Sequence, residues 1–226
     1  MIGIITAMSS EAEAIKSLME ITEESEEAGC VFSAGNIEGE PLVVCLGGVG
    51  KALAAMATTL LIQKYDPDLV MNVGVAGGMK ESQKVCDLVV SSEIIQGDYD
   101  TTPVDGPAGL GKYFETPIKL QNHAQRVMSE LPIRSELGAI CSQDKFVTKG
   151  PDVKRIQVLF PQSACAEMEA GAIAQVCAAF GVDLVAIKSL SDVAVHDSNP
   201  MEYSEFEKKA ARTAGEFVQA WCRSLD

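Results

Sequence analysis

Short apolar segments alternate with segments of helical spacing along the whole chain. The apolar segments are continuous, which is typical of strands buried on both faces of a sheet. We expect these strands over residues 2–7, 41–46, 68–74, 86–95, 138–147 and 183–193. The helical spacing predicts helices over residues 11–19, 51–65, 118–131, 164–180 and 202–224. The alternation predicts an α/β fold with a mixed, mostly parallel central sheet flanked by helices.

No change of composition, repeat or linker divides the chain, so we expect a single domain over residues 1–226. One long connection, residues 97–117, shows neither pattern. Connections of more than about 12 to 15 residues are usually functional or mobile, and we expect the same of this one.

The predicted helix over residues 164–180 is almost entirely small or apolar, yet Glu167 and Glu169 lie near its start. Burying an unpaired carboxylate is costly, so the presence of these two acids in an apolar segment requires an explanation. Two more acids lie near strand ends: Glu11 after the first strand and Asp192 in the last. Helix capping or first-turn placement would explain Glu11 or Asp192 taken singly. All four could also converge on one pocket at the end of the sheet.

A pair of carboxyl groups, one of them protonated, is the usual equipment for cleaving a glycosidic bond. One group activates water and the other protonates the leaving group. A third carboxylate near the sugar would stabilise a transition state that resembles an oxocarbenium ion. This chemistry requires neither a metal nor a cofactor, and we expect none.

Two glycine turns follow predicted strands. "GGVGKA" differs from a phosphate-binding loop, because it lacks the upstream glycine and has Ala52 where a hydroxyl residue is needed. "GVAGG" does not fit the dinucleotide fingerprint. Both turns still lie at strand ends, where Gly50, Gly74, Gly77 and Gly78 would let a ligand approach the backbone closely.

Composition excludes several classes of function. The formal net charge is −14, which opposes nucleic acid and anionic membranes as partners. The seven cysteines are scattered without a CxxC pair, so buried thiols are favoured over disulfides or a zinc site. No apolar run reaches the roughly 18 residues of a membrane span, and the first residues do not resemble a signal peptide. We therefore expect a cytoplasmic protein.

The motifs "GIITAMSSEAEA", "GGVGKALAA", "NVGVAGG", "DYDTTPVDGPAG", "DKFV", "AEMEAGAIAQVC" and "SLSDVA" follow one another along nearly the whole chain. In this order they resemble the 5′-methylthioadenosine/S-adenosylhomocysteine nucleosidases of the nucleoside phosphorylase superfamily. The resemblance implies that the protein hydrolyses the N-glycosidic bond of an adenine nucleoside and has a nucleoside phosphorylase-like fold. It also implies a homodimer in which the long connection reaches toward the partner's pocket.

The resemblance assigns roles to the acids. Glu11 would activate the attacking water, with Glu167 helping to hold it. Glu169 would bind the ribose hydroxyls. Asp192, oriented by Ser191, would protonate N7 of the adenine.

The remaining roles concern substrate binding. Met168 would pack beside the sugar, Phe146 would stack on the purine, and the Val147 backbone would bond to the purine edge. The other binding positions that the resemblance implies are Met8, Val49 and Tyr203 around the 5′ substituent, Val75, Ala76 and Gly77 at the floor, and Lys188 near the water.

The chain departs from the common family pattern at Val75, Gly97, Val104 and Lys188, where a hydroxyl residue, a histidine, an aromatic residue and an arginine are frequent. These departures bear on substrate preference more than on the type of reaction. Phosphorylases of this fold hold phosphate with arginines, whereas no arginine precedes Arg126 here. A carboxylate beside a phosphate is repulsive, but beside a water it is a base. The sequence therefore favours hydrolysis. The alternatives are a purine nucleoside phosphorylase, a futalosine-type hydrolase, or a non-catalytic relative that binds a nucleoside.

Overall fold

The computed structural model describes residues 1–147, 150–195 and 200–225, with the backbone alone over residues 200–205. Ten strands of these residues join in one sheet. They are β1 (Ile2–Thr6), β2 (Glu20–Glu27), β3 (Cys30–Ile37), β4 (Glu40–Leu46), β5 (Leu69–Gly78), β6 (Leu88–Asp100), β7 (Leu110–Glu115), β8 (Ser135–Ser142), β9 (Ser163–Glu167) and β10 (Asp183–Val193).

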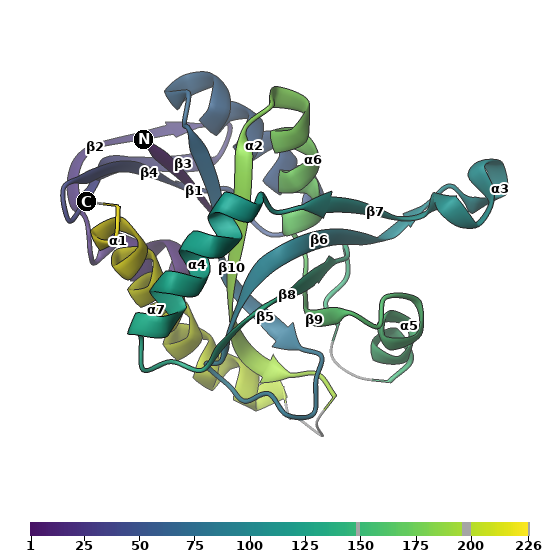
Figure 1. Cartoon of the computed structure of the whole chain (residues 1–226). Helices are drawn as coiled ribbons and strands as arrows, with labels where there is room; N and C mark the ends of the chain where they lie inside the picture. The colour runs from purple at the N-terminus through teal and green to yellow at the C-terminus, as the bar shows by residue number, and fades with distance from the viewer. Residues whose placement is uncertain (148–149, 196–199, 226) are drawn as a thin grey trace.

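Helices cover both faces of this sheet (Figure 1). They are α1 (Ser9–Lys16), α2 (Lys51–Tyr65), α3 (Thr102–Asp105), α4 (Ile118–Glu130), α5 (Pro151–Leu159), α6 (Ala170–Phe180) and α7 (Pro200–Arg223), with the 3-10 turn η1 (Gly106–Gly109) after α3. The helices α2 and α6 pack together on one face, and α1, α4 and α7 cover the other. Apolar strand residues alternate between the two cores, which is why the strand sequences are continuously apolar.

The strand order is β10-β6-β8-β9-β5-β1-β4-β3-β2, and β10 also pairs with β5. The strands β5, β9, β8, β6 and β10 therefore close into a ring, from which β1, β4, β3 and β2 extend as an open sheet. Parallel pairs join β1 to β4 and β5, β5 to β10, and β8 to β6 and β9. The mixed α/β sheet predicted from the sequence is confirmed. Its antiparallel part is larger than expected, because hairpins were not recognised in two segments and because β6 with β10 and β5 with β9 also pair antiparallel.

The first of these segments is the hairpin of β2 and β3, which pair antiparallel. The strand β2 is mostly glutamate and exposed, so it shows no apolar pattern. It forms the end of the strand order and, among the described strands, pairs only with β3. Charged side chains on such an edge oppose pairing with another chain.

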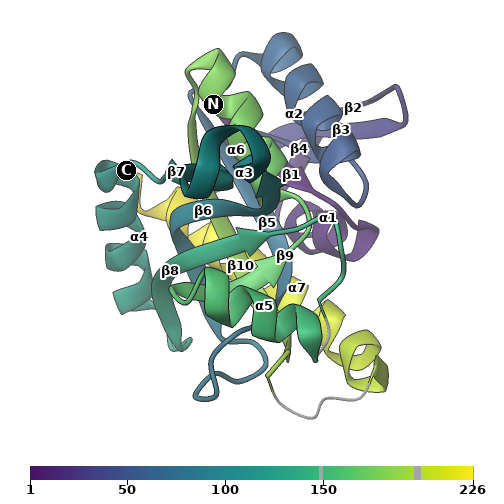
Figure 2. The same cartoon turned by 90° about the vertical axis from the view of Figure 1, so that its right-hand side faces the viewer.

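The second segment is the long connection, and the expectation that it is irregular is wrong. The strand β6 continues to Asp100, and β7 returns antiparallel to it, with Ile95 opposite Tyr113. This hairpin projects from the body as an arm with α3 at its end (Figure 1), and Figure 2 views the molecule from the arm's side. The last three residues of β6 are exposed and β7 is mostly exposed or half-buried, so the pairing of the two strands continues beyond the end of the apolar pattern.

Other predicted boundaries also differ from the structure, and the predicted turn "GVAGG" forms the end of the strand β5. The segment 164–180 is not one helix, because β9 pairs with β5 and β8 before α6 begins at Ala170. The strand predicted over 138–147 is β8, which ends at Ser142, so residues 143–147 are free to bend toward the end of the sheet. The helix α5 was not predicted.

Candidate active site

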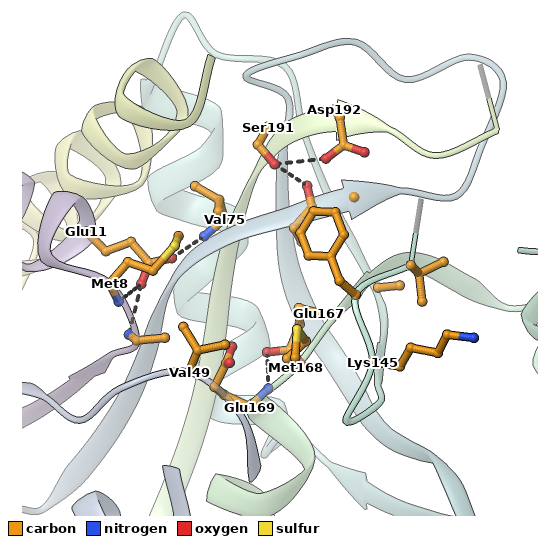
Figure 3. Close-up of a pocket in the computed structure, with 16 residues that line it drawn as sticks. Met8, Glu11, Val49, Val75, Lys145, Glu167, Met168, Glu169, Ser191 and Asp192 are labelled. Atoms are coloured by element: carbon orange, nitrogen blue, oxygen red, sulfur yellow. Dashed lines mark hydrogen bonds between the residues drawn. The ribbon is translucent and has the colours of Figure 1, made fainter. Parts of the chain in front are cut away.

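A pocket lies where several strands end, at the carboxyl ends of β1, β5, β9 and β10 (Figure 3). Carboxylates from distant parts of the sequence surround it. The lining residues are Ala7, Met8, Glu11, Val49, Val75, Ala76, Gly77, Lys145, Phe146, Val147, Ala166, Glu167, Met168, Glu169, Ser191 and Asp192. The four acids therefore converge on one pocket, as the sequence predicts.

Glu11 is held in the first turn of α1 by backbone amides. The Ala7 and Met8 amides donate to its Oε2 at 2.9 and 3.0 Å, and the Val75 amide donates to its Oε1 at 2.9 Å. Burial raises the pKa of Glu11, while Lys188 and these amides act in the opposite direction. A buried carboxylate with a raised pKa is a stronger base than an exposed one. Gly74 leaves room for it, since a Cβ there would lie 2.4 Å from Glu11 Oε1.

Glu167 ends β9 and forms the junction with α6. Its carboxylate accepts hydrogen bonds from the Glu169 amide at 3.1 Å and the Ala170 amide at 2.9 Å, where the positive end of the helix dipole favours an anion. Lys188 Nζ lies 3.0 Å from Glu167 Oε2, and both side chains are only 2% exposed. The Lys188 ammonium, which lies behind the pocket, therefore balances the negative charge of Glu167.

Glu169 occupies the N-cap position of α6, and its Oε1 accepts a hydrogen bond from the Gly50 amide at 2.8 Å. Burial and the neighbouring Glu167 raise the pKa of Glu169 to about 7, against the influence of Lys188. Near neutral pH its carboxyl group therefore carries only part of a negative charge. Such a group can exchange hydrogen bonds with hydroxyls as either donor or acceptor.

Asp192 lies near the end of β10, across the pocket from Glu11 (Figure 3). The register of β10 against β5 shifts between Leu190 and Asp192, which re-aims the chain at this point. Ser191 Oγ lies 2.9 Å from Asp192 Oδ1 and can donate to it. A Cβ at Gly77 would lie only 3.4 Å from Asp192 Oδ2, so the bare backbone of Gly77 forms the floor beside this acid.

Apolar side chains complete the walls of the pocket. Val49 and Phe146 are each 49% exposed, which is high for large apolar residues. Both line the pocket with Met8, Val75 and Met168, so a ligand with an apolar ring and an apolar substituent would cover them.

Most sequence-predicted site residues line this pocket. Lys188 does not, because it lies behind Glu167 and is 1% exposed. The side chain of Tyr203 lies outside the described residues. The sequence reasoning did not select Ala7, Lys145 and Ala166. Each lies inside a quoted motif, directly before a selected residue, so proximity in the sequence was the available signal.

Two further chemical features can be stated for the part of the chain that the structure describes. Its His, Cys, Asp and Glu side chains form no group of three or more that could hold a metal ion. None of its helices combines the length and apolarity that a membrane span requires.

The chain belongs to the phosphorylase superfamily, whose family model matches residues 1–223. This confirms the resemblance drawn from the motifs. A relative from Geobacillus thermodenitrificans, named 5′-methylthioadenosine/S-adenosylhomocysteine nucleosidase, is 38% identical over 222 residues, covering 96% of this chain and 93% of its own length.

Solved structures show the same fold. An enzyme of that name from Neisseria meningitidis, in complex with methylthio-immucillin-A, aligns with a TM-score of 0.93 and 32% identity over 99% of both chains. The futalosine hydrolase of Helicobacter pylori aligns with a TM-score of 0.91 and 30% identity over 99% of this chain and 97% of its own.

Proposed function

We propose that this protein hydrolyses the N-glycosidic bond of 5′-methylthioadenosine and S-adenosylhomocysteine, releasing adenine and the 5-substituted ribose. The observation that carries the proposal is the placement of Glu11, Glu169 and Asp192 around one pocket. Relatives with this named activity cover nearly the whole chain. We also expect activity on 5′-deoxyadenosine, because this compound differs from 5′-methylthioadenosine only in lacking the 5′ sulfur substituent.

The proposed reaction uses two of the acids for proton transfer. Glu11 takes a proton from a water molecule as the water oxygen bonds to C1′ of the ribose. The bond from C1′ to N9 breaks, its electron pair passes to the purine, and Asp192 donates a proton to N7. Ser191 keeps the Asp192 carboxyl oriented through the 2.9 Å contact. Each proton transfer contributes typically 10² to 10⁴ in rate.

Glu169 has a separate task. Its carboxylate, fixed by the Gly50 amide, would accept hydrogen bonds from the ribose hydroxyls. Partial negative charge beside the sugar stabilises the positive charge that develops on the ring. Phe146 would stack on the purine and Met168 would pack beside the ribose, which places the bond to be cleaved between Glu11 and Asp192.

Hydrolysis is favoured over phosphorolysis by the charges of the pocket. Of its described lining residues none is an arginine, and the basic one, Lys145, pairs with Asp152 at 2.7 Å. Glu11, Glu167 and Glu169 would repel a phosphate ion at the place where a nucleophile must attack.

The test is a substrate panel. The protein is incubated without phosphate with 5′-methylthioadenosine, S-adenosylhomocysteine, 5′-deoxyadenosine and inosine, and free base is measured by chromatography. We expect adenine from the first three. Release of adenine that requires added phosphate would instead identify a phosphorylase.

A futalosine-type hydrolase is the second candidate, because such an enzyme shares the fold at a TM-score of 0.91. The same acids would serve both reactions, and the substrates differ in the 5′ substituent and in the base. Adding futalosine to the panel separates the two. Cleavage of futalosine without cleavage of 5′-methylthioadenosine would replace the first candidate by the second.

We also propose a homodimer. A groove between α2 and α6 is lined mostly by small and apolar residues, including Ala55, Val176 and Phe180. The arm of β6 and β7 projects from the body (Figure 1) and carries Val104 with 87% of its surface exposed. Both features suit contact with a second copy. The net charge of −14 supports the absence of nucleic acid and membranes among the partners.

A cytoplasmic location completes the proposal. All seven cysteines are free thiols, and most are buried. Unpaired thiols are the usual condition in a reducing compartment.

A further inference from the structure

The glycine turn before α2 binds carboxylates of its own chain. The Gly50 amide donates to Glu169 Oε1 at 2.8 Å, and the next amide, of Lys51, donates to Asp144 Oδ1 at 3.2 Å. Gly50 has a φ of 95°, in the left-handed region that favours glycine. The helix α2 has 15 residues, so its N-terminus favours negative charge. A turn that resembles a phosphate loop therefore holds two acidic side chains.

A second link joins the same residues. Lys51 Nζ pairs with Asp98 Oδ1, and Asp98 Oδ2 accepts a hydrogen bond from the Asp144 amide at 2.7 Å. The side chain of Lys51 is 16% exposed and that of Asp98 is 34% exposed, so solvent screens the pair only in part. Partial burial would raise the pKa of Asp98, but the Asp144 amide and Lys51 lower it overall. Lys51, Asp98 and Asp144 thus form a closed cluster of contacts, which we call the clasp.

The clasp lies directly before the part of the pocket assigned to the purine. Asp144 precedes Lys145, Phe146 and Val147, all of which line the pocket. The residue before Asp144 is held as well, because the Gln143 amide donates a hydrogen bond to the Glu167 carbonyl of β9 at 2.9 Å. The described contacts therefore fix the start of segment 145–147 from two directions.

The two anchors are adjacent in the sequence. Gly50 holds Glu169, the proposed partner of the ribose, and Lys51 holds Asp144, the start of the purine-binding segment. Neighbouring amides of one helix N-terminus cannot move far relative to each other. The N-terminus of α2 therefore holds both the ribose side and the purine side of the pocket in fixed positions relative to each other.

We propose that Lys51, Asp98 and Asp144 are positioning residues that keep the purine-binding segment in register with Glu169. None of the three lines the pocket, so they act through Phe146 and Val147 rather than on the substrate. This inference rests on the proposed function, because it takes segment 145–147 as the purine site. The glycine turn would then have a structural role that does not involve binding a nucleotide phosphate.

The test measures adenine binding and nucleoside cleavage in Lys51→Met and Asp98→Asn. We expect the dissociation constant of adenine and the KM for 5′-methylthioadenosine to rise about tenfold, the effect of losing one charged contact. The kcat should change less than about threefold, because Glu11 and Asp192 keep their own contacts. Lys51→Arg keeps the charge and should restore adenine affinity to near the wild-type value.

The matched control is Lys119→Met, which breaks an ion pair of 2.6 Å with Asp183 away from the pocket lining. It should leave adenine affinity and KM unchanged. Circular dichroism checks folding. Sedimentation checks assembly, because Lys51 also lines the groove between α2 and α6. If Lys51→Met does not fold, Asp98→Asn carries the test.

Wild-type adenine affinity in folded Lys51→Met and Asp98→Asn would overturn the inference, as would a loss confined to kcat. A wild-type protein that neither binds adenine nor cleaves any nucleoside would instead overturn the proposed function. The two failures are therefore distinguishable in one set of measurements.

Discussion

The four acids of the pocket differ in the contacts that hold them. Glu11 is fixed by three backbone amides, Glu167 by a helix N-terminus and Lys188, and Glu169 by a single amide. Asp192 is contacted by the neighbouring Ser191 hydroxyl. Carboxyl groups could therefore supply the proposed base, charged support, ribose ligand and acid, because the surroundings set the ionisation of each.

In the proposed reaction, departure of the purine depends on Asp192. Asp192→Asn keeps the shape and can keep the contact with Ser191, but it cannot donate a proton to N7. We expect kcat for 5′-methylthioadenosine to fall by about 10² to 10⁴ with an unchanged circular dichroism spectrum. Asp183→Asn, at the start of the same strand, is the control and should keep full activity. Wild-type turnover by Asp192→Asn would remove this acid from the mechanism.

Glu169 should make stability depend on pH. Burial and Glu167 raise its pKa in the folded protein from 4.5 to about 7, so folding favours the neutral form. The stability contributed by the neutral group is fully present below about pH 4.5 and is lost as the pH rises through about 7. Ionisation then costs up to roughly 3 kcal/mol.

Glu169→Gln avoids this cost while still accepting the Gly50 hydrogen bond. Measured by thermal unfolding, the variant should gain Tm relative to wild type between pH 5 and pH 8, by roughly 2–4 °C for each kcal/mol. The exposed Glu23 of β2 provides the control, Glu23→Gln, whose difference from wild type should stay constant. A constant difference for Glu169→Gln as well would show that Glu169 ionises without this cost.

Among the secondary-structure elements, the junction of β9 and α6 shows what the sequence could not reveal. Glu167 and Glu169 were recognisable because carboxylates stand out among small apolar residues. Their separation into a strand end and a helix cap was not, because alanine, cysteine and glycine fit either conformation. Pairing of β9 with β5 and β8 decides it, and such pairing links residues far apart in the chain.

The same limit explains the other errors. The outer end of the arm is exposed and is formed by pairing between β6 and β7, and β2 is polar because it lies at an edge. Lys188 was expected near the attacking water because the family resemblance places an arginine or lysine there. The register of β10 shifts between Leu190 and Asp192, so Asp192 reaches the pocket while Lys188 is buried and pairs with Glu167.

The ion pair of Lys188 and Glu167 should be a strong structural link between β10 and β9. Burial alone would lower the pKa of Lys188, but Glu167, Glu169 and Glu11 raise it overall, so the ammonium form is retained. Lys188→Met leaves Glu167 buried without its cation. We expect it to lower the free energy of unfolding by about 3–5 kcal/mol in urea titrations.

Two comparisons sharpen this measurement. The double variant Glu167→Gln with Lys188→Met removes both charges and should recover part of the loss. Lys80→Met breaks an ion pair with Glu136 whose side chains are 41% and 35% exposed, and it should cost less than about 1 kcal/mol. Equal losses in Lys188→Met and Lys80→Met would show that burial does not strengthen the Lys188 pair.

For the whole molecule, the proposed homodimer rests on an apolar groove and a projecting arm that a second copy could contact. The groove between α2 and α6 includes Ala179 and Phe180, and Phe180 is 46% exposed. Light scattering should give a particle of twice the chain mass of 24.0 kDa. Ala179→Glu places a charge in the groove and should shift the particle toward the monomer, because desolvating an unpaired carboxylate opposes association.

Val158→Glu is the matched control for that shift. Val158 is 77% exposed on α5 and does not line the groove, so its variant should remain dimeric. If the arm of one copy completes the pocket of the other, the monomeric Ala179→Glu should also show a higher KM for 5′-methylthioadenosine at low protein concentration. A wild-type particle of one chain mass, with full activity, would show that this pocket works without a partner.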